Sequence, residues 1–281
     1  MEYRKLYNGI KIPMLGFGVF QIPNYDNAKQ AVLTALKAGY RLIDTAQAYM
    51  NEKAVGDAIK ESGIAREEIF ITTKLWIQDF SYDKAIKATE LSLERLGVDY
   101  IDLMLLHQPM GDYINAWKGL EKLYKDSKLK AIGMANCYPH VLADLCETFE
   151  IKPMINQVEM HPFFQQKLNL ETMKEYDVIP EAWAPFNEGL NNFFSNSILT
   201  EIGKKYNKTA AQVALRWNIQ RGVVVIPKSV HKDRIKQNFD IFDFTLSQED
   251  MDKIASMDIG HSEIVNHFDP QFVKALHNHK F

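Results

Sequence analysis

Short apolar segments alternate with longer amphipathic ones along almost the whole chain, and this alternation restricts the possible folds most. Two of the short segments, residues 103–106 and 223–226, are apolar at every position. Such runs are typical of parallel strands buried on both faces, not of antiparallel strands with one solvated face. The longer segments carry apolar residues at helical spacing, as in residues 210–220. The pattern therefore predicts a parallel sheet whose strands are joined by helices.

The alternation contains eight such strands, each followed by at least one helix. The predicted strands span residues 15–20, 41–46, 69–76, 101–107, 130–136, 155–160, 179–185 and 223–227. The predicted helices span residues 27–37, 52–62, 83–96, 116–125, 140–149, 167–176, 198–206, 210–220, 232–239 and 248–256. Eight strand–helix units in 281 residues are typical of an α/β fold of the (β/α)8 TIM-barrel type. A doubly wound open sheet would divide the chain into two halves, and no Pro-, Gly- or Ser-rich linker marks such a division, so we expect one domain over residues 1–281.

Two features are predicted outside the eight units. An antiparallel β-hairpin precedes the barrel at residues 3–13, centred on Asn8-Gly9. This dipeptide is typical of a type I′ turn, because both residues tolerate a positive φ. Extra helices follow the seventh and eighth strands, where two helical segments occur in succession.

The charge balance and the absence of long apolar runs exclude several classes of protein. The chain has 33 Lys+Arg against 36 Asp+Glu, a formal charge of −3, whereas nucleic-acid binding needs a basic surface. No apolar run approaches the ~18 residues that cross a bilayer, and the first residues lack the apolar stretch of a signal peptide. Cys137 and Cys146 show no CxxC spacing, which predicts reduced thiols and no cysteine-based zinc site. We therefore expect a cytoplasmic protein that binds neither nucleic acid nor membrane.

Polar side chains stand at the ends of three neighbouring predicted strands. Asp44 lies near the end of the second strand with Tyr49 just beyond it, and Lys74 lies near the end of the third. His107 ends the fourth. Because the carboxyl ends of barrel strands meet at one face, we expect these side chains to converge. Each alone is more often a turn former, a solvated side chain or a core histidine than a catalytic residue, but four on adjacent strands indicate a site.

The chemistry of the four groups is complementary. A tyrosine phenol has an ordinary pKa near 10, which is too high for an efficient acid at neutral pH. The Lys74 ammonium is expected to lower the pKa of Tyr49, and Asp44 to hold the lysine in place. His107 could orient a substrate oxygen. These properties predict a site that donates a proton to a carbonyl oxygen as it becomes an alkoxide.

A second polar cluster follows the last predicted strand. Lys228 and Ser229 come directly after it, and Arg234 lies in the next helix. Phosphate sites in barrels commonly form after strands seven and eight, at a helix N-terminus. The cluster therefore predicts binding of a phosphate monoester, with a solvated helix start as the alternative.

Motifs along nearly the whole chain resemble those of the aldo-keto reductase superfamily. The similar segments are residues 41–46 with Tyr49, then 73–76, 96–103, 156–159, 211–217 and 226–229. The tail at residues 267–270 is similar to the prokaryotic branch that includes 2,5-diketo-gluconate and glyoxal reductases. The resemblance implies a barrel enzyme that reduces a small-molecule carbonyl substrate, such as a small aldehyde, a dicarbonyl or a keto-sugar, with NADPH. It also implies a monomer without a metal.

The resemblance further implies a role for each matching residue. Tyr49 would be the general acid, tuned by Asp44 and Lys74, and His107 would orient the carbonyl. The residues implied to bind NADPH/NADP+ are Gly18, Asp44, Asn136, Gln157, Trp183, Lys228, Ser229, Val230, Arg234, Gln237 and Asn238. Among these, Asn136 and Gln157 would hold the nicotinamide carboxamide, and Trp183 would stack on the nicotinamide ring. The adenosine 2′-phosphate would be bound by Lys228, Ser229 and Arg234. The residues implied to contact substrate are Trp76, His107 and Gln108.

The sequence departs from the family pattern at a few of these positions. Ala135 replaces a usual serine, which removes one hydroxyl contact worth about 1 kcal/mol. Gln108 replaces a frequent tryptophan, and Gln237 a frequent glutamate near the adenine. None of these changes touches Asp44 or its three predicted partners, so activity is expected while specificity is open.

Two other classes of function stay possible on sequence grounds. Metal-dependent hydrolysis is one, since many barrels use His and carboxylates, although no HExxH motif occurs and His277-Asn278-His279 lies in the tail. A non-catalytic role is the other, because some relatives of the superfamily are channel-associated subunits or lens proteins. The intact set of Asp44, Tyr49, Lys74 and His107 argues against it.

Overall fold

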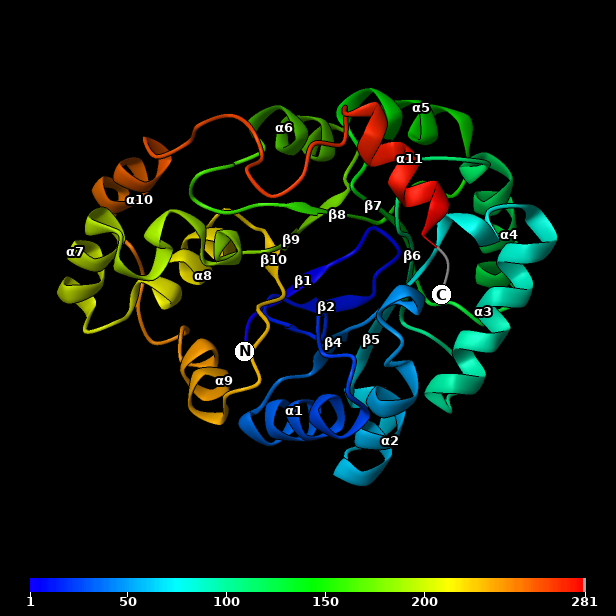
Figure 1. Cartoon of the computed structure of the whole chain (residues 1–281), viewed down its shortest axis with the longest axis horizontal. Helices are drawn as coiled ribbons and strands as arrows, with labels where there is room; N and C mark the ends of the chain where they lie inside the picture. Colours follow the sequence, from blue (N-terminus) through cyan, green and yellow to red (C-terminus); the bar gives the residue numbers. More distant parts are fainter. Residues whose placement is uncertain (280–281) are drawn as a thin grey trace.

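Eight parallel strands form a barrel in the order in which they occur along the chain (Figure 1). The computed structural model describes residues 1–279. The barrel strands are β3 (Phe17–Gly18), β4 (Leu42–Asp44), β5 (Phe70–Leu75), β6 (Leu103–Leu106), β7 (Ile132–Ala135), β8 (Ile155–Glu159), β9 (Ile179–Trp183) and β10 (Val224–Val225). All eight lie within the strands predicted from the sequence.

The barrel is closed by hydrogen bonds between residues 14–16, just before β3, and Val225 on β10. Val225 N donates to Met14 O at 3.0 Å, and Gly16 N donates to Val225 O at 2.8 Å. Two glycines permit this approach, since a Cβ on Gly16 would lie 3.0 Å from Ile226 Cγ2 and one on Gly18 would lie 2.9 Å from Ile226 O. The predicted (β/α)8 barrel is therefore confirmed.

Each predicted helix is present in the structure. The helices are α1 (Tyr25–Ala38), α2 (Glu52–Ser62), α3 (Tyr82–Leu96), α4 (Tyr113–Lys125), α5 (Pro139–Thr148), α6 (Lys167–Glu175), α7 (Ser197–Tyr206), α8 (Ala210–Gln220), α9 (Lys232–Phe239) and α10 (Gln248–Ala255). Three-residue 3₁₀ turns are η1 (Gln47–Tyr49), η2 (Arg66–Glu68) and η3 (Ile77–Asp79), and the longer segment η4 (Asn187–Ser195) is interrupted by non-helical residues 188–192. The extra helices are also confirmed, because α7 and α8 both lie between β9 and β10. No helix among the described residues is both long and apolar enough to span a bilayer.

The sequence interpretation missed one helix, α11 (Pro270–Asn278). Its start carries the usual signals: the Asp269 side chain accepts from Gln271 N, and Pro270 occupies the first turn. The helix lies against η3, where Gln78 Nε2 donates to His277 O at 3.0 Å. Helix α11 thus lies beside the carboxyl-terminal ends of the barrel strands.

The N-terminal hairpin is present, but its turn differs from the predicted type. Strands β1 (Tyr3–Lys5) and β2 (Lys11–Pro13) pair antiparallel, and Gly9 N donates to Leu6 O. Gly9 alone of the Asn8-Gly9 pair has a positive φ, of 93°, so the predicted type I′ turn is wrong. The Asn8 side chain instead holds the loop, donating to Lys130 O and accepting from Ile10 N.

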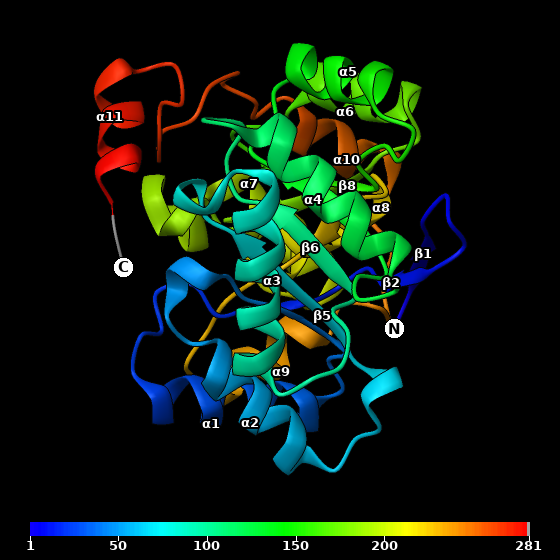
Figure 2. The ribbon, with the colours of Figure 1, turned by 90° about the vertical axis from the view of Figure 1, so that its right-hand side faces the viewer.

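The hairpin lies at the opposite end of the barrel from α11 (Figure 2). Its contacts are to residues just before barrel strands, since Tyr7 OH donates to Lys152 O and Asn8 to Lys130 O. The hairpin therefore covers the amino-terminal ends of the strands, which leaves the carboxyl-terminal ends for the site.

Candidate active site

The four residues predicted from the strand ends meet at the carboxyl-terminal face of the barrel. Lys74 Nζ on β5 lies 2.6 Å from Asp44 Oδ1 on β4 and donates to Thr45 O at 2.9 Å. The same nitrogen donates to Tyr49 OH at 3.3 Å. Lys74 and Asp44 are both buried. The lysine thus joins a buried carboxylate to a phenol.

The position of Tyr49 depends on a buried glutamine that the sequence did not single out. Tyr49 ends the short helix η1, which begins at Gln47. Gln47 Nε2 donates to Ala88 O on α3, and its Oε1 accepts from Trp76 N after β5. These bonds hold η1 against two neighbouring elements, and so they fix the direction of the tyrosine side chain.

The pKa of Tyr49 differs from the sequence prediction in its direction. Burial raises the pKa of the phenol, Lys74 lowers it and Asp44 raises it again, and the net result lies above the ordinary value. The predicted lowering by Lys74 is present, but desolvation and the paired carboxylate outweigh it in the protein alone. Tyr49 keeps its proton at neutral pH and is available as a donor.

His107 is neutral and stands beside Tyr49. Burial and the Lys74 ammonium lower its pKa well below the ordinary value. Its ring meets the Tyr49 ring edge-on, with centroids 5.8 Å apart, and meets Trp76 in the same way at 5.1 Å. His107 Nδ1 is buried and has no hydrogen-bond partner in the described part of the chain. A neutral imidazole at this place can act as a hydrogen-bond partner for a substrate oxygen.

The predicted nicotinamide-binding side chains line the next part of the same face. Asn136 follows β7 with φ 59°; its Nδ2 donates to His107 O, and its Oδ1 accepts from Trp183 Nε1 at 2.9 Å. Gln157 on β8 donates from Nε2 to Asp44 Oδ2 at 2.8 Å and to Glu181 Oε2 at 3.1 Å. Both amide hydrogens of Gln157 thus face carboxyl groups, so the amide would meet a carboxamide N–H through its oxygen.

The cationic cluster lies where β10 leads into α9. Lys228 and Arg234 are exposed, and neither forms an ion pair with an acidic side chain among residues 1–279. Ser229 is buried, and its Oγ accepts from His231 N at the start of the helix. Gly18 lies beside this cluster, since a Cβ built on it would be 3.9 Å from Lys228 Cβ. Two cations without carboxylate partners at a helix N-terminus can hold a phosphate.

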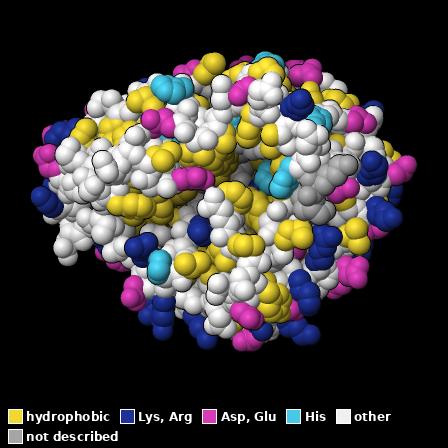
Figure 3. Space-filling view, in the orientation of Figure 1, with side chains coloured by type: hydrophobic (Ala, Val, Ile, Leu, Met, Phe, Trp, Pro, Cys, Tyr) yellow, Lys and Arg dark blue, Asp and Glu magenta, His cyan; other side chains and the backbone are white. Residues whose placement is uncertain are grey.

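The other predicted adenosine-side residues lie on or near the same helix. Val230 is 51% exposed, Gln237 is exposed, and Asn238 is buried. The face as a whole is hollowed near its centre, with hydrophobic and histidine side chains at the hollow and a few cationic side chains nearby (Figure 3).

Comparison with known proteins identifies the family. The family model described as the aldo/keto reductase family matches residues 14–259. The chain belongs to the aldo/keto reductase family. It is 52% identical to glyoxal reductase of Bacillus subtilis (strain 168) over 254 residues, which cover 90% of this chain and 91% of that relative. It is 41% identical to methylglyoxal reductase DkgA of Escherichia coli (strain K12) over 259 residues, covering 91% and 93%.

Solved structures agree with this assignment. The crystal structure of a Bombyx mori aldo-keto reductase in complex with NADP matches with a TM-score of 0.90 at 32% identity, covering 97% of this chain and 96% of that one. The predicted resemblance to the prokaryotic branch that contains dicarbonyl reductases is confirmed by the two bacterial relatives.

The part of the face beside Tyr49 and His107 is bordered by aromatic side chains and by α11. Trp76 Nε1 donates to His279 O at 3.1 Å, which joins the end of the described chain to the residue that follows β5. Phe20, which the sequence interpretation left out, packs on Tyr49 with ring centroids 5.0 Å apart. Gln108 is buried, and its Oε1 has no partner among the described residues. The predicted positions Trp76 and Gln108 thus lie next to the tyrosine and histidine pair.

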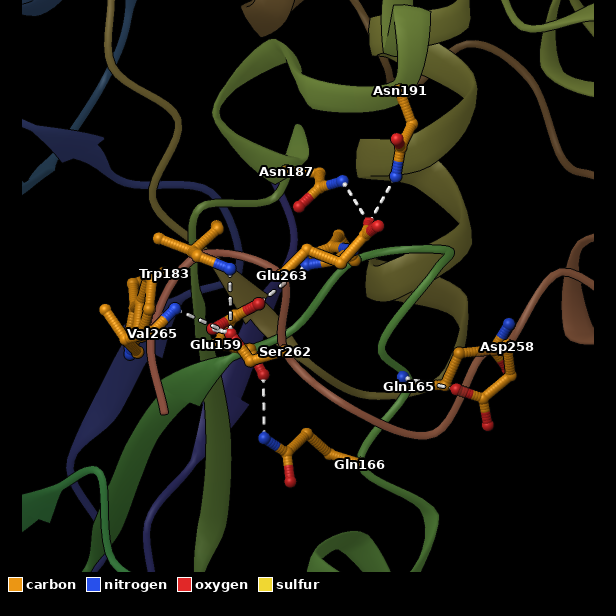
Figure 4. Close-up of polar contacts among 12 residues, drawn as sticks. Glu159, Gln165, Gln166, Trp183, Asn187, Asn191, Asp258, Ser262, Glu263 and Val265 are labelled. Carbon is orange, nitrogen blue, oxygen red and sulfur yellow. Dashed lines mark hydrogen bonds and ion pairs between the residues drawn. The ribbon is translucent and has the colours of Figure 1, made fainter. Parts of the chain in front are cut away.

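A strap formed by residues 258–268 crosses the loop that follows β9 (Figure 4). Ser262 Oγ donates to Glu159 Oε2 at 2.6 Å, which anchors the strap to the end of β8. Glu263 Oε2 accepts from Asn187 Nδ2 at 3.3 Å and also from Asn191 Nδ2. The strap therefore ties η4, which begins four residues after Trp183, to the barrel. Among the described residues, no group of three or more His, Cys, Asp or Glu is placed to hold a metal ion.

Proposed function

We propose that this aldo-keto reductase reduces a carbonyl group to an alcohol with NADPH, using Tyr49 as the general acid. The observation that carries the proposal is the contact of one buried ammonium, Lys74 Nζ, with both Asp44 and Tyr49 OH. A protonated phenol beside a fixed cation is suited to give its proton to an oxygen that gains negative charge.

The residues present fit the dinucleotide. Lys228 and Arg234 offer cations to the 2′-phosphate, Gly18 leaves room beside them, and Asn136 and Gln157 offer amide groups to the carboxamide. When bound, NADPH supplies the hydride, and the protein supplies orientation and electrostatics.

Proton transfer then follows from the geometry of the four side chains. His107, being neutral, hydrogen-bonds the carbonyl oxygen and holds it near Tyr49 OH. As the oxygen becomes an alkoxide, the Tyr49 proton moves to it, and the phenolate that remains is stabilised by Lys74. Asp44 keeps the ammonium in place throughout.

For the substrate we propose a small aldehyde, a dicarbonyl or a keto-sugar. Two bacterial relatives that carry the names glyoxal reductase and methylglyoxal reductase favour the dicarbonyls. Turnover of a panel of these three classes, measured as NADPH consumption, tests the proposal; absence of turnover with every class would contradict it.

We further propose a cytoplasmic monomer in which residues 1–281 form one domain. Light scattering of the purified protein tests the monomer.

Arg234→Ala is expected to weaken NADPH far more than NADH. A charge-assisted contact to the 2′-phosphate corresponds to about 10- to 100-fold in the dissociation constant, and NADH lacks this phosphate. The measurement is fluorescence titration with both nucleotides. Lys236→Ala, on the same helix and equally exposed, is the matched control. Equal weakening of NADPH and NADH by Arg234→Ala would refute the assigned contact.

Glu263→Ala is expected to speed release of the bound nucleotide. We propose that η4 covers the cofactor, because it begins four residues after Trp183 and is held there by the strap. Losing two exposed hydrogen bonds should raise the NADPH dissociation rate about 2- to 10-fold in stopped-flow fluorescence. Glu263→Gln, whose amide oxygen can still accept, should stay near the original rate, and Glu171→Ala is the exposed control. An unchanged rate in Glu263→Ala would show that the strap does not hold the cofactor loop.

A further inference from the structure

A buried carboxyl group that the mechanism does not use lies beside the site. Glu181 on β9 is completely buried, and its Oε2 accepts from Gln157 Nε2 at 3.1 Å. The same nitrogen donates to Asp44 Oδ2 at 2.8 Å. The two residues also stand opposite each other in the sheet, because Gln157 pairs with Glu181 in the register of β8 and β9. One amide group therefore links Glu181 to Asp44.

The balance of charges in this part of the barrel favours a neutral Glu181. The groups around it are Asp44 from β4, Tyr49 from η1, Lys74 from β5, the uncharged Gln157 from β8 and, in register on β10, the apolar Val224. The single ammonium is in direct contact with Asp44. If both carboxyls were ionised, one buried negative charge would lack a cation, which is costly in a dry interior.

The remaining oxygen of Glu181 points to the same conclusion. Glu181 Oε1 is buried and has no hydrogen-bond partner in the described part of the chain. An unpartnered hydroxyl costs less than an unpartnered anionic oxygen. Burial and the nearby Asp44 raise the pKa of Glu181 to about 8, against the lowering by Gln157 and Lys74.

We propose that Glu181 is a positioning residue. In its neutral form it holds the Gln157 amide with the oxygen toward the carboxyl-terminal face of the barrel, and its ionisation lowers activity. This inference rests on the proposed reductase function. The carboxyl groups of Asp44 and Glu181 both accept from the Gln157 nitrogen. The flipped amide would place its oxygen against these two acceptors, so a single orientation is favoured. Its oxygen is then presented to the nicotinamide carboxamide, as the assigned role of Gln157 requires.

Ionisation of Glu181 would disturb the site through charge. A second anion next to Asp44 would compete for Lys74 and would raise the pKa of Tyr49 further, which makes the phenol a poorer acid. The kcat/KM for carbonyl reduction is therefore expected to fall above about pH 8, by up to about tenfold for each pH unit. Loss of the Tyr49 proton itself would act only at higher pH, because the pKa of Tyr49 lies above its ordinary value.

The first experiment compares pH profiles of kcat/KM for the original enzyme, Glu181→Gln and Glu181→Leu. Glu181→Gln keeps a neutral acceptor for Gln157, so it should lose the fall above pH 8. Glu181→Leu removes the acceptor, and its NADPH dissociation constant should rise about fivefold, with rescue by Glu181→Gln. Glu201→Gln, exposed on α7, is the control and should keep the original profile. A fall near pH 8 that persists in Glu181→Gln would overturn the proposal.

The second experiment needs neither cofactor nor substrate. A carboxyl whose pKa is raised by folding binds its proton more tightly in the native state, so its contribution to stability is lost as pH rises from the unfolded value to the folded one. Between about pH 4.5 and pH 8, urea unfolding should therefore show Glu181→Gln gaining stability relative to the original protein. A constant difference over this range would overturn the neutral carboxyl. Absence of carbonyl turnover in every protein, together with the expected stability shift, would instead contradict the reductase function and leave the neutral carboxyl standing.

Discussion

Tyr49→Phe is expected to lower kcat/KM for carbonyl reduction about 10²- to 10⁴-fold, the usual contribution of a positioned general acid. The change removes one oxygen atom and leaves the ring, whose contacts with Phe20 and His107 are apolar or edge-on. The pocket should therefore keep its shape, and NADPH should bind within about threefold of the original affinity, since no cofactor contact is assigned to the hydroxyl. Both quantities are measured on the same preparation, by NADPH consumption and by fluorescence titration.

A matched control exists elsewhere in the chain. Tyr176→Phe makes the same chemical change at a hydroxyl that donates to Glu147, outside the site, and should leave kcat/KM unchanged. If Tyr49→Phe keeps near-normal turnover, Tyr49 is not the acid. If it loses NADPH binding as well as turnover, the hydroxyl has a role in holding the cofactor that the structure does not indicate.

The strands, the helices and the place of the site could be predicted because they depend on local patterns. Apolar runs such as Leu103–Leu106 are typical of buried parallel strands, and the carboxyl ends of such strands share one face. This rule alone predicts that Asp44, Lys74 and His107 converge on that face, as they do in the structure. Barrel closure, by contrast, depends on the close approach allowed by Gly16 and Gly18, which no sequence period reveals.

The parts that sequence reasoning missed depend on three-dimensional neighbours. The net direction of the Tyr49 pKa results from competition between burial, Lys74 and Asp44, and only the assembled site sets their balance. The turn at Asn8 also depends on such a neighbour, since the Asn8 side chain donates to Lys130 O at the amino-terminal end of the barrel. Glu181, however, was recognisable from the sequence. A carboxyl group within the predicted buried strand 179–185 needs a polar partner in the barrel interior, and this indicates a place near Asp44. The Asp269-Pro270 start of α11 was also readable as a helix N-terminus.

Lys74→Met should be nearly as damaging to activity as the tyrosine variant, and it should also destabilise the protein. Its ammonium is the single cation in contact with the buried Asp44 among the described residues. Removing one partner of a buried pair costs about 3–5 kcal/mol of unfolding free energy, because the other charge is left uncompensated. Loss of the positive charge beside the developing phenolate should lower kcat about 10²- to 10³-fold.

The double variant Asp44→Asn, Lys74→Met separates these two effects. An asparagine at position 44 carries no charge, and its oxygen can still accept from Gln157 Nε2, as Asp44 Oδ2 does. Most of the lost unfolding free energy should therefore return in urea denaturation. Activity should not return, because the phenolate of Tyr49 still lacks its cation. Recovery of turnover together with stability would mean that Lys74 serves only to fold the barrel, whereas a stable, NADPH-binding and inactive double variant assigns the ammonium to the proton-transfer step.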